Sequence, residues 1–443
     1  MPDESLEPGA VPRGGVMARV RASEAYRSIF RTPPLDTARG RALKSFGNVF
    51  LHLYPVKVPW RVLQWRYSFR LGFITTVLFI VLAVTGTYLM FFYTPSVAHA
   101  YGDMQRLRSE IGFGQLLRNV HRWGAHLMVL ATALHVGRVM LTGAYAKPRQ
   151  FNWVIGVGLL IVTLAYSFTG YLLPWDQLSY WAVRVASDLV HYVPFVGPEL
   201  RAVLLGGSNI GQDTLLRFYV LHVAVLTVAF FALIAVHIWR VRKDGFAVER
   251  GGAPPWAVAD GAPVPESRGE RPDTPYPAAP DERVRLLGVV ERTGVEREPP
   301  EEDDTVFTWP HLIVRHQVIA MAVVAICLAM GIAFEAPLRE LANPNLTHEP
   351  AKAPWYFVGL QELLAHFDPV IAGVLVPIVL GAWLVFLPYL DRNAGRPLRE
   401  RRVAVATFVV LGIIAVILTI IGALFRGPGW VWVLPWEHWY FEP

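Results

Sequence analysis

Seven stretches of this sequence are long and apolar enough to cross a lipid bilayer. A bilayer core of about 30 Å needs roughly 20 apolar residues of helix, because a helix rises about 1.5 Å per residue. The composition agrees, since 53% of the 443 residues are hydrophobic and 17% are charged. We therefore predict an all-α membrane protein with about seven transmembrane helices. The predicted spans lie near 70–92, 117–141, 153–173, 218–240, 312–334, 369–390 and 403–424.

Basic residues gather on one side of these spans. The connections after the second and sixth spans and the end of the fourth are rich in arginine and lysine, as in "DRNAGRPLRERR" and "RVRKDGF". The positive-inside rule places them in the cytoplasm. The segment 1–60 lacks the apolar run of a cleavable signal peptide, so we expect the chain to begin there too. The net charge of +6 then reflects topology and does not indicate nucleic-acid binding.

The spans fall into two blocks separated by a segment of different composition. Residues 244–308 are rich in proline, glycine and charge, which predicts a flexible cytoplasmic linker. It separates a four-span domain, 61–243, from a three-span domain, 309–425. A cytoplasmic extension, 1–60, precedes them, and an aromatic tail, 426–443, is expected on the outer side, where its tryptophans suit the membrane interface.

Histidines recur at matching intervals in the second and fourth spans. His121 and His135 stand at positions i and i+14, and His222 and His237 stand at i and i+15. At about 1.5 Å and 100° per residue, His121 and His135 share one helix face at depths roughly 21 Å apart. The two spans run in the same direction, so an outer pair, His121 with His222, and an inner pair, His135 with His237, should form. Two such pairs are what two six-coordinate haem irons require. His126 points about 140° away from His121, so we interpret it as a hydrogen-bonded packing residue.

Glycines in the first and third spans repeat the interval. Gly72 and Gly86 also stand at i and i+14, as do Gly156 and Gly170, which puts them at the same two depths. A flat macrocycle edge needs neighbours without a Cβ. Glycine is also common in membrane helices for packing alone, but the matching intervals favour a role at two haems.

Arginines flank the proposed outer and inner pairs. Arg118 and Arg122 adjoin His121, while Arg138 and Arg242 lie at the inner ends of their spans. Guanidinium groups there could neutralise haem propionates. Ordinary positive-inside flanking explains Arg138 and Arg242 equally well, but it does not explain the two outer arginines.

These motifs resemble the cytochrome b subunit of quinol:cytochrome c and quinol:plastocyanin oxidoreductases. The stretches "NVHRWGAHLMVLATALHV", "TGYLLPWDQLSYWAV" and "LLRFYVLHVAV" resemble the four-helix cytochrome b of the plastid-type bf complex, and the longer histidine interval in the fourth span agrees with that branch. The segment from "TWPHLIVRHQVIAMAVV" through "FLPYLDRNAGRPLRERR" resembles its three-helix subunit IV, fused here behind the linker. The resemblance covers roughly residues 50–425 and adds Trp175, in "LLPWDQ", to the expected cofactor-binding residues.

One departure from the bf pattern concerns a third haem. Proteins of that branch attach an extra haem through a cysteine at the start of the first span, and the matching residue here is Arg70. The single cysteine, Cys327, lies in the fifth span, which also excludes a disulfide within the chain. No covalent third haem is therefore expected, beside two non-covalent b-type haems with two histidine ligands each.

A second departure lies in the quinol-oxidising motif, usually Pro-Glu-Trp-Tyr, which reads "APWY" here, so that proline replaces the proton-accepting glutamate. We expect Tyr356 to be catalytic. If one helix holds Tyr356 and Glu362, they are turned about 240° apart, so Glu362 is awkward unless the helix starts after Phe357. We favour Glu362 slightly, because the motif leads directly into its helix. The expected quinol-binding residues are Pro354, Trp355, Tyr356 and Phe357, and the candidate proton acceptors are His348, Glu349 and Glu362.

The resemblance implies bifurcated quinol oxidation near the outer face of a bacterial inner membrane. One electron passes to a Rieske iron–sulfur protein and a c-type cytochrome. The other crosses through the outer and then the inner b haem to a quinone, which contributes to the proton gradient. It also implies a dimeric complex in a respiratory electron-transport chain.

Two other functions stay open from the residues alone. A haem-free, proton-coupled transporter could use membrane histidines as a relay, but it would need midplane carboxylates, which the first four spans lack. A dihaem membrane anchor of another quinone-linked dehydrogenase would not need the second block with "PWYF".

Overall fold

The computed structural model describes residues 54–247, 305–347, 350–393 and 398–437. Of the described residues, 54–57 belong to one unit and the remainder, from Val58 onward, to a second. Most of the predicted extension and linker therefore lie outside the described residues.

Within the described residues, seven helices are long and apolar enough to cross a membrane, which confirms the predicted fold class. Two contain a π-helical turn: Gln212–Asp244 is built from α12 (Gln212–Val220), η2 (Leu221–Val225) and α13 (Leu226–Asp244), and Val370–Leu390 from η4 (Val370–Leu375) and α16 (Val376–Leu390). The other five are α6 (Leu71–Met90), α8 (Gly114–Thr142), α9 (Gln150–Tyr171), α14 (Thr308–Ala333) and α17 (Arg402–Leu424).

Shorter elements connect these spans. The described ones are β1 (Lys57–Pro59), η1 (Trp60–Leu63), α5 (Trp65–Ser68), α7 (Ala100–Ser109), α10 (Gln177–His191), α11 (Gly197–Leu205), β2 (Thr305–Phe307), α15 (Trp355–Leu364), η5 (Leu398–Glu400) and η6 (Pro428–Trp430). Asp176 caps α10 by accepting a hydrogen bond from Ser179 N, and its other oxygen accepts from Arg339 N. The "PWDQ" turn thus joins the two blocks.

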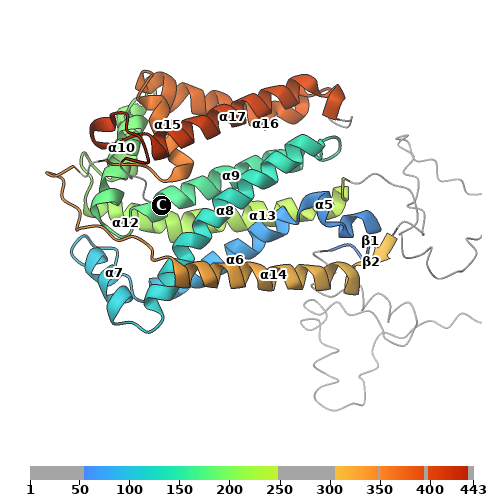
Figure 1. Ribbon diagram of the computed structural model, residues 1–443, viewed down its shortest axis with the longest axis horizontal. Coiled ribbons are helices and arrows are strands. Elements are labelled where there is room, and N and C mark those ends of the chain that lie inside the picture. Colours follow the sequence, from blue (N-terminus) through green and yellow to red (C-terminus); the bar gives the residue numbers. More distant parts are fainter. Residues whose placement is uncertain (1–53, 248–304, 348–349, 394–397, 438–443) are drawn as a thin grey trace, which may run out of the picture. The chain divides into compact units, whose positions relative to one another are not determined.

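The four-span block is built from two helix pairs, α6 with α8 and α9 with α13 (Figure 1). Side chains between the two histidine depths fill its centre, and Phe79 stacks on Phe230 with ring centres 3.9 Å apart. From the second block, α14 packs against α8 and α6, α16 packs against α9, and α15 lies along α17.

Buried polar contacts join the two blocks near both ends of α8. At one end Arg118 donates to the carbonyl oxygens of Ala336 and Pro337, each at 2.7 Å. At the other, the buried Arg401 donates to Met140 O of α8 at 3.0 Å and pairs with Asp391 of its own block at 3.1 Å. A buried ion pair of this kind is destabilising when one partner is lost, because the remaining charge is left uncompensated.

Candidate functional site

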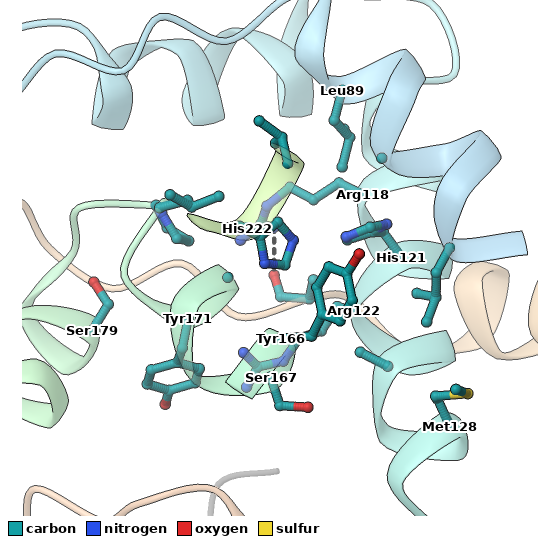
Figure 2. Close-up of a pocket in the computed structure, with 18 of the residues that line it drawn as sticks. Leu89, Arg118, His121, Arg122, Met128, Tyr166, Ser167, Tyr171, Ser179 and His222 are labelled. Carbon is teal, nitrogen blue, oxygen red and sulfur yellow. Dashed lines mark hydrogen bonds between the residues drawn. The ribbon is translucent and has the colours of Figure 1, made fainter. Parts of the chain in front are cut away.

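His121 on α8 and His222 in η2 lie close together and line one cavity (Figure 2). Their ring centres are 6.4 Å apart, and the ring planes are inclined by 71°. Two imidazoles that share one metal, with metal–nitrogen bonds of about 2 Å, have ring centres roughly 6 Å apart. Among the described residues no three His, Cys, Asp or Glu side chains gather to hold a metal ion. The pair therefore suits a metal whose remaining ligands come from a cofactor.

Threonine hydroxyls orient both rings of this outer pair. Thr85 Oγ lies 2.9 Å from Nδ1 of His121, and Thr169 Oγ lies 3.2 Å from Nδ1 of His222. Each hydroxyl also donates to a carbonyl of its own helix at 2.8 Å, so it can only accept from the ring. Nδ1 therefore carries the proton in both rings, and Nε2 keeps the lone pair that binds a metal.

Each of the four predicted glycines faces one of the four histidines. A Cβ added at Gly170 would lie 2.6 Å from Cε1 of His222, and one at Gly86 would lie 3.0 Å from the His121 ring. The corresponding distances are 3.1 Å from Gly72 to His135 and 3.6 Å from Gly156 to His237. The contact is thus with the imidazole rather than with a macrocycle edge: glycine leaves room for the ring against the neighbouring helix.

A π-helical turn accounts for the unequal histidine intervals. An interval of i to i+15, from His222 to His237, would turn the two side chains apart by about 60° in a regular helix. Leu221–Val225 forms a π-helix, which adds one residue without adding a turn. The longer interval in the fourth span therefore presents its two histidines much as the shorter interval does in α8.

The inner pair lies in a different setting. His135 of α8 faces Gly72 of α6, and His237 of α13 faces Gly156 of α9. Arg138, at i+3 from His135, donates to Tyr67 O at 2.6 Å, and its guanidinium lies 4.8 Å from the Tyr67 ring centre. Arg138 thus holds the segment that leads into α6. Arg242 is exposed at the end of α13.

The two outer arginines differ in their contacts. Arg118 uses two nitrogens on carbonyls of the second block, whereas Arg122 lies over the Tyr171 ring at 5.0 Å and has a buried Nε without a partner. Both line the outer cavity, as Figure 2 shows. Of the two, Arg122 is better placed to bind an anionic group.

The outer cavity has a volume of about 310 Å³ and is lined by both blocks. It holds His121, His222, Gly86 and Gly170, and extends to Tyr356 of the second block. Trp175 does not line it; this buried residue packs edge-on against Tyr180 and accepts a hydrogen bond from Ala342 N. Trp175 thus links the "LLPWDQ" motif to the second block through its backbone carbonyl.

The predicted quinol motif begins a helix at the edge of this cavity. Pro354 caps α15, whose first residues are Trp355, Tyr356 and Phe357. The Tyr356 ring is edge-on to His126 at 5.6 Å and to Phe357 at 5.0 Å. Burial raises the pKa of the Tyr356 hydroxyl, although Arg122 and a hydrogen bond with Ser167 act against this. Tyr356 is thus a neutral group at physiological pH.

Glu362 lies on a different face of α15 and does not line this cavity. The helix starts at Trp355, so the turn of about 240° from Tyr356 applies. Its side chain is 1% exposed and binds Arg426 at 2.6 Å and Trp430 Nε1 at 3.0 Å. Burial alone would raise the pKa of Glu362, but hydrogen bonds from Arg426 and His366 leave it lowered. This placement disfavours Glu362 as the proton acceptor. Two other candidates, His348 and Glu349, lie outside the described residues.

Sequence reasoning did not identify the threonine partners or the contact of His126. Thr85 and Thr169 each directly precede a glycine that faces a histidine, so the repeated "TG" dipeptide was the available signal. His126 is hydrogen-bonded, as expected of a packing residue, but its partner is Trp355 of the quinol motif and it also lines the cavity.

Comparisons with known proteins agree for both blocks. A family model described as cytochrome b/b6/petB matches residues 58–245, and one described as cytochrome b(C-terminal)/b6/petD matches residues 341–441. The chain is 43% identical over 177 residues to cytochrome b6 of Acaryochloris marina, covering 40% of this chain and 82% of that protein. The values for cytochrome b6 of Synechococcus elongatus are the same. A solved structure titled hyperthermophilic respiratory Complex III is 23% identical, with a TM-score of 0.65, over 87% of this chain and 89% of that one.

Proposed function

This chain belongs to the cytochrome b/b6 family, and on that premise we propose that it is the dihaem subunit of a quinol:cytochrome c oxidoreductase. Family membership makes it a multi-pass cytochrome b of a bc-type complex. The finer proposal places it in a bacterial inner membrane, in a dimeric complex with a Rieske iron–sulfur protein and a c-type cytochrome.

The observation that carries the proposal is the outer histidine pair. Its ring centres are 6.4 Å apart, and both Nδ1 atoms lie beside threonine hydroxyls that can only accept. The two Nε2 lone pairs are therefore available to one metal. A proton relay would not need both rings locked in the same tautomer. This favours haem ligation over the transporter alternative.

The residues proposed to hold two b-type haems come from all four spans of the first block. His121 with His222, and His135 with His237, would bind the two haem irons, and Gly72, Gly86, Gly156 and Gly170 leave space for their rings. Arg122, with Arg118, is proposed to face the carboxylates of the outer haem, and Arg138 and Arg242 those of the inner one. When bound, the haems supply one-electron carriers at two membrane depths.

The part of the outer cavity that Tyr356 lines is the proposed site of quinol oxidation, and the part between His121 and His222 is that of the outer haem. Tyr356 lines the cavity, and Pro354, Trp355 and Phe357 set the start of its helix. Arg122 and Tyr171 lie at the same cavity and restrict the position of a head group. The neutral Tyr356 hydroxyl can orient a quinol oxygen by hydrogen bonding. Of the flanking carboxylates, we now favour Glu349 as the proton acceptor, because Glu362 is paired with Arg426.

We also propose that the two blocks act as one functional unit. The four-span domain, 61–243, would hold both haems, and the three-span domain, 309–425, would complete the quinol cavity. The contribution of Tyr356 to a cavity that also contains both outer histidines supports this division. A dihaem membrane anchor of another dehydrogenase would not need a residue of the second block, such as Tyr356, in this cavity.

Optical spectra and turnover of the purified complex test this function. Two b-type α-bands on reduction, together with reduction of cytochrome c by added quinol, are expected. Haem bands without quinol:cytochrome c activity would favour the dehydrogenase anchor, and absence of haem absorbance would exclude both redox functions. His366→Gln, which alters a histidine outside the cavity, serves as the matched control.

A further inference from the structure

His126 is a buried histidine at the outer cavity that the proposed function leaves without a role. Its side chain is 7% exposed and lines the cavity beside Tyr356. Nδ1 accepts a hydrogen bond from Nε1 of Trp355 at 3.2 Å. Nε2 is buried and has no hydrogen-bond partner. The ring is therefore held at one nitrogen and unsatisfied at the other.

The contact with Trp355 decides which nitrogen carries the proton. Indole N–H is a donor only, so Nδ1 of His126 must be the accepting nitrogen. A neutral imidazole then carries its single N–H at Nε2. A buried N–H without an acceptor is costly, and such exceptions in native structures call for an explanation such as a ligand.

The surroundings indicate what kind of ligand fits. The Tyr356 ring, which lines the cavity, lies 5.6 Å from the ring of His126, and the Tyr171 ring lines the same cavity. Flat aromatic surfaces at a cavity with one N–H donor suit a flat ring that carries an acceptor oxygen. Pro354, which stands where related motifs have glutamate, has no side-chain donor or acceptor.

We propose that Nε2–H of His126 donates a hydrogen bond to a ring oxygen of the quinone or quinol bound in this cavity. The proposal rests on the proposed function and adds a substrate-positioning residue to it. Because Trp355 occupies Nδ1, His126 acts as a donor and is not the proton acceptor. Its role is to fix the head group beside Tyr356.

A haem carboxylate could offer the same acceptor chemistry in the same cavity. A quinone and a haem carboxylate both carry oxygen acceptors, but a hydrogen bond to each changes a different measurable property. A hydrogen bond to a quinone lowers the stretching frequency of its carbonyl group. A hydrogen bond to a haem carboxylate changes the properties of the outer haem. Infrared and haem measurements on the same samples separate the two sources.

Infrared difference spectra of the intact complex with an oxidised short-chain quinone test the proposal. A benzoquinone and a naphthoquinone are used separately, with wild type, His126→Phe, His126→Gln and the control His366→Phe. We expect a downshifted carbonyl band in wild type and the control, loss of the shift in His126→Phe, and partial retention in His126→Gln. Quinone affinity in His126→Phe should fall roughly three- to tenfold, as loss of one hydrogen bond predicts.

Labelling the histidines of wild type with ¹⁵N gives a readout without any substitution. A change in the bound carbonyl band on labelling is expected, and its absence would count against the proposal. If His126→Phe fails to assemble, Trp355→Phe removes the donor that fixes the tautomer and should weaken the carbonyl shift.

Two results would overturn the proposal. One is an unchanged carbonyl band and unchanged quinone affinity in His126→Phe. The other is a shifted outer-haem potential with unchanged quinone binding, which would assign the N–H to a haem carboxylate. Failure of the proposed function is distinguishable, because wild type itself would then neither bind quinone nor oxidise quinol.

Discussion

The outer and inner histidine pairs consist of the same residue type but differ in what holds the rings. At the outer pair, threonine hydroxyls lie beside Nδ1 of both rings, and a π-helical turn carries His222. At the inner pair, no hydroxyl bonds either ring within the described part of the chain. The glycine contacts are also closer at the outer pair, 3.0 and 2.6 Å against 3.1 and 3.6 Å for an added Cβ. The outer rings are oriented by hydroxyl groups of neighbouring helices, Thr85 of α6 and Thr169 of α9, whereas the inner rings depend more on packing and on the ligand itself.

Removing one ligand from each pair should have the largest effect. His222→Ala is expected to abolish the outer haem and His135→Ala the inner one, because each haem would lose one of its two proposed histidine ligands. Haem per chain should fall by about half in each variant. Pyridine haemochrome stoichiometry and the two reduced α-bands are the measurements. Loss of the same band in both variants would contradict the pairing.

Substitution of the glycines that face the histidines should have a smaller effect, and one that differs between the outer and the inner pair. Gly170→Ala places a Cβ 2.6 Å from the His222 ring, so the ring must move and the outer haem should be retained roughly tenfold less tightly. Gly156→Ala, at 3.6 Å from His237, makes an ordinary contact and should leave the inner haem in place. Haem retention during dilution is the measurement. Equal loss of haem in the two variants would show that a side chain is tolerated equally poorly at both glycine positions.

The spans of the fold followed from the sequence because the length of an apolar run is a property of the chain itself. The seven predicted spans are confirmed, and the facing of His121 and His222 follows from helix rise and direction. The threonine contacts did not follow, since a hydroxyl that bonds its own helix carbonyl is the usual behaviour of threonine in a membrane helix. The π-helical turn could have been inferred from the histidine interval of the fourth span, which is one residue longer than that of the second span.

The second block was less predictable because its site depends on contacts between distant segments. The turn of about 240° between Tyr356 and Glu362 was available from helix geometry, and the start of α15 at Trp355 bears it out. The partner that occupies Glu362, Arg426, comes from beyond the seventh span, and nothing in sequence spacing joins them. In the same way, the long separation in sequence between His126 and Trp355 hides their hydrogen bond.

Removing a threonine contact should alter the outer haem without removing it. In Thr85→Val, Nδ1–H of His121 loses its acceptor, so the imidazole becomes a weaker electron donor and the outer haem potential should rise. A hydrogen bond of about 1 kcal/mol corresponds to roughly 40 mV for one electron. Potentiometric titration of both α-bands measures this, with the inner haem as the internal control. A shift confined to the inner haem would refute the assignment.

Glu362→Gln is expected to act on stability rather than on redox properties. The folded pKa of Glu362 is lowered, so its carboxylate contributes stability that is fully present above the unfolded pKa of about 4.3. That contribution is lost as pH falls through the lower folded pKa. The variant should therefore lose stability at neutral pH and differ less from wild type in acid. Thermal unfolding of the complex between pH 3 and 7, a range chosen to bracket about 4.3, is the measurement.

The smallest expected effect concerns the pH dependence of quinol oxidation. Because Arg426 and Trp430 occupy the Glu362 carboxylate outside the cavity, Glu362→Gln should leave the pH profile of quinol:cytochrome c activity unchanged, whatever it does to stability. Glu349→Gln should shift the acid limb if Glu349 accepts the proton, since no carboxylate would then stand next to "PWYF". Profiles for both variants and the double variant are compared at equal haem content.

An altered pH profile in Glu362→Gln alone would show that Glu362 is the proton acceptor after all, because a carboxylate that stays paired with Arg426 cannot control the pH dependence of turnover. An unchanged profile in the double variant would exclude both carboxylates and leave His348 or a chain of water molecules.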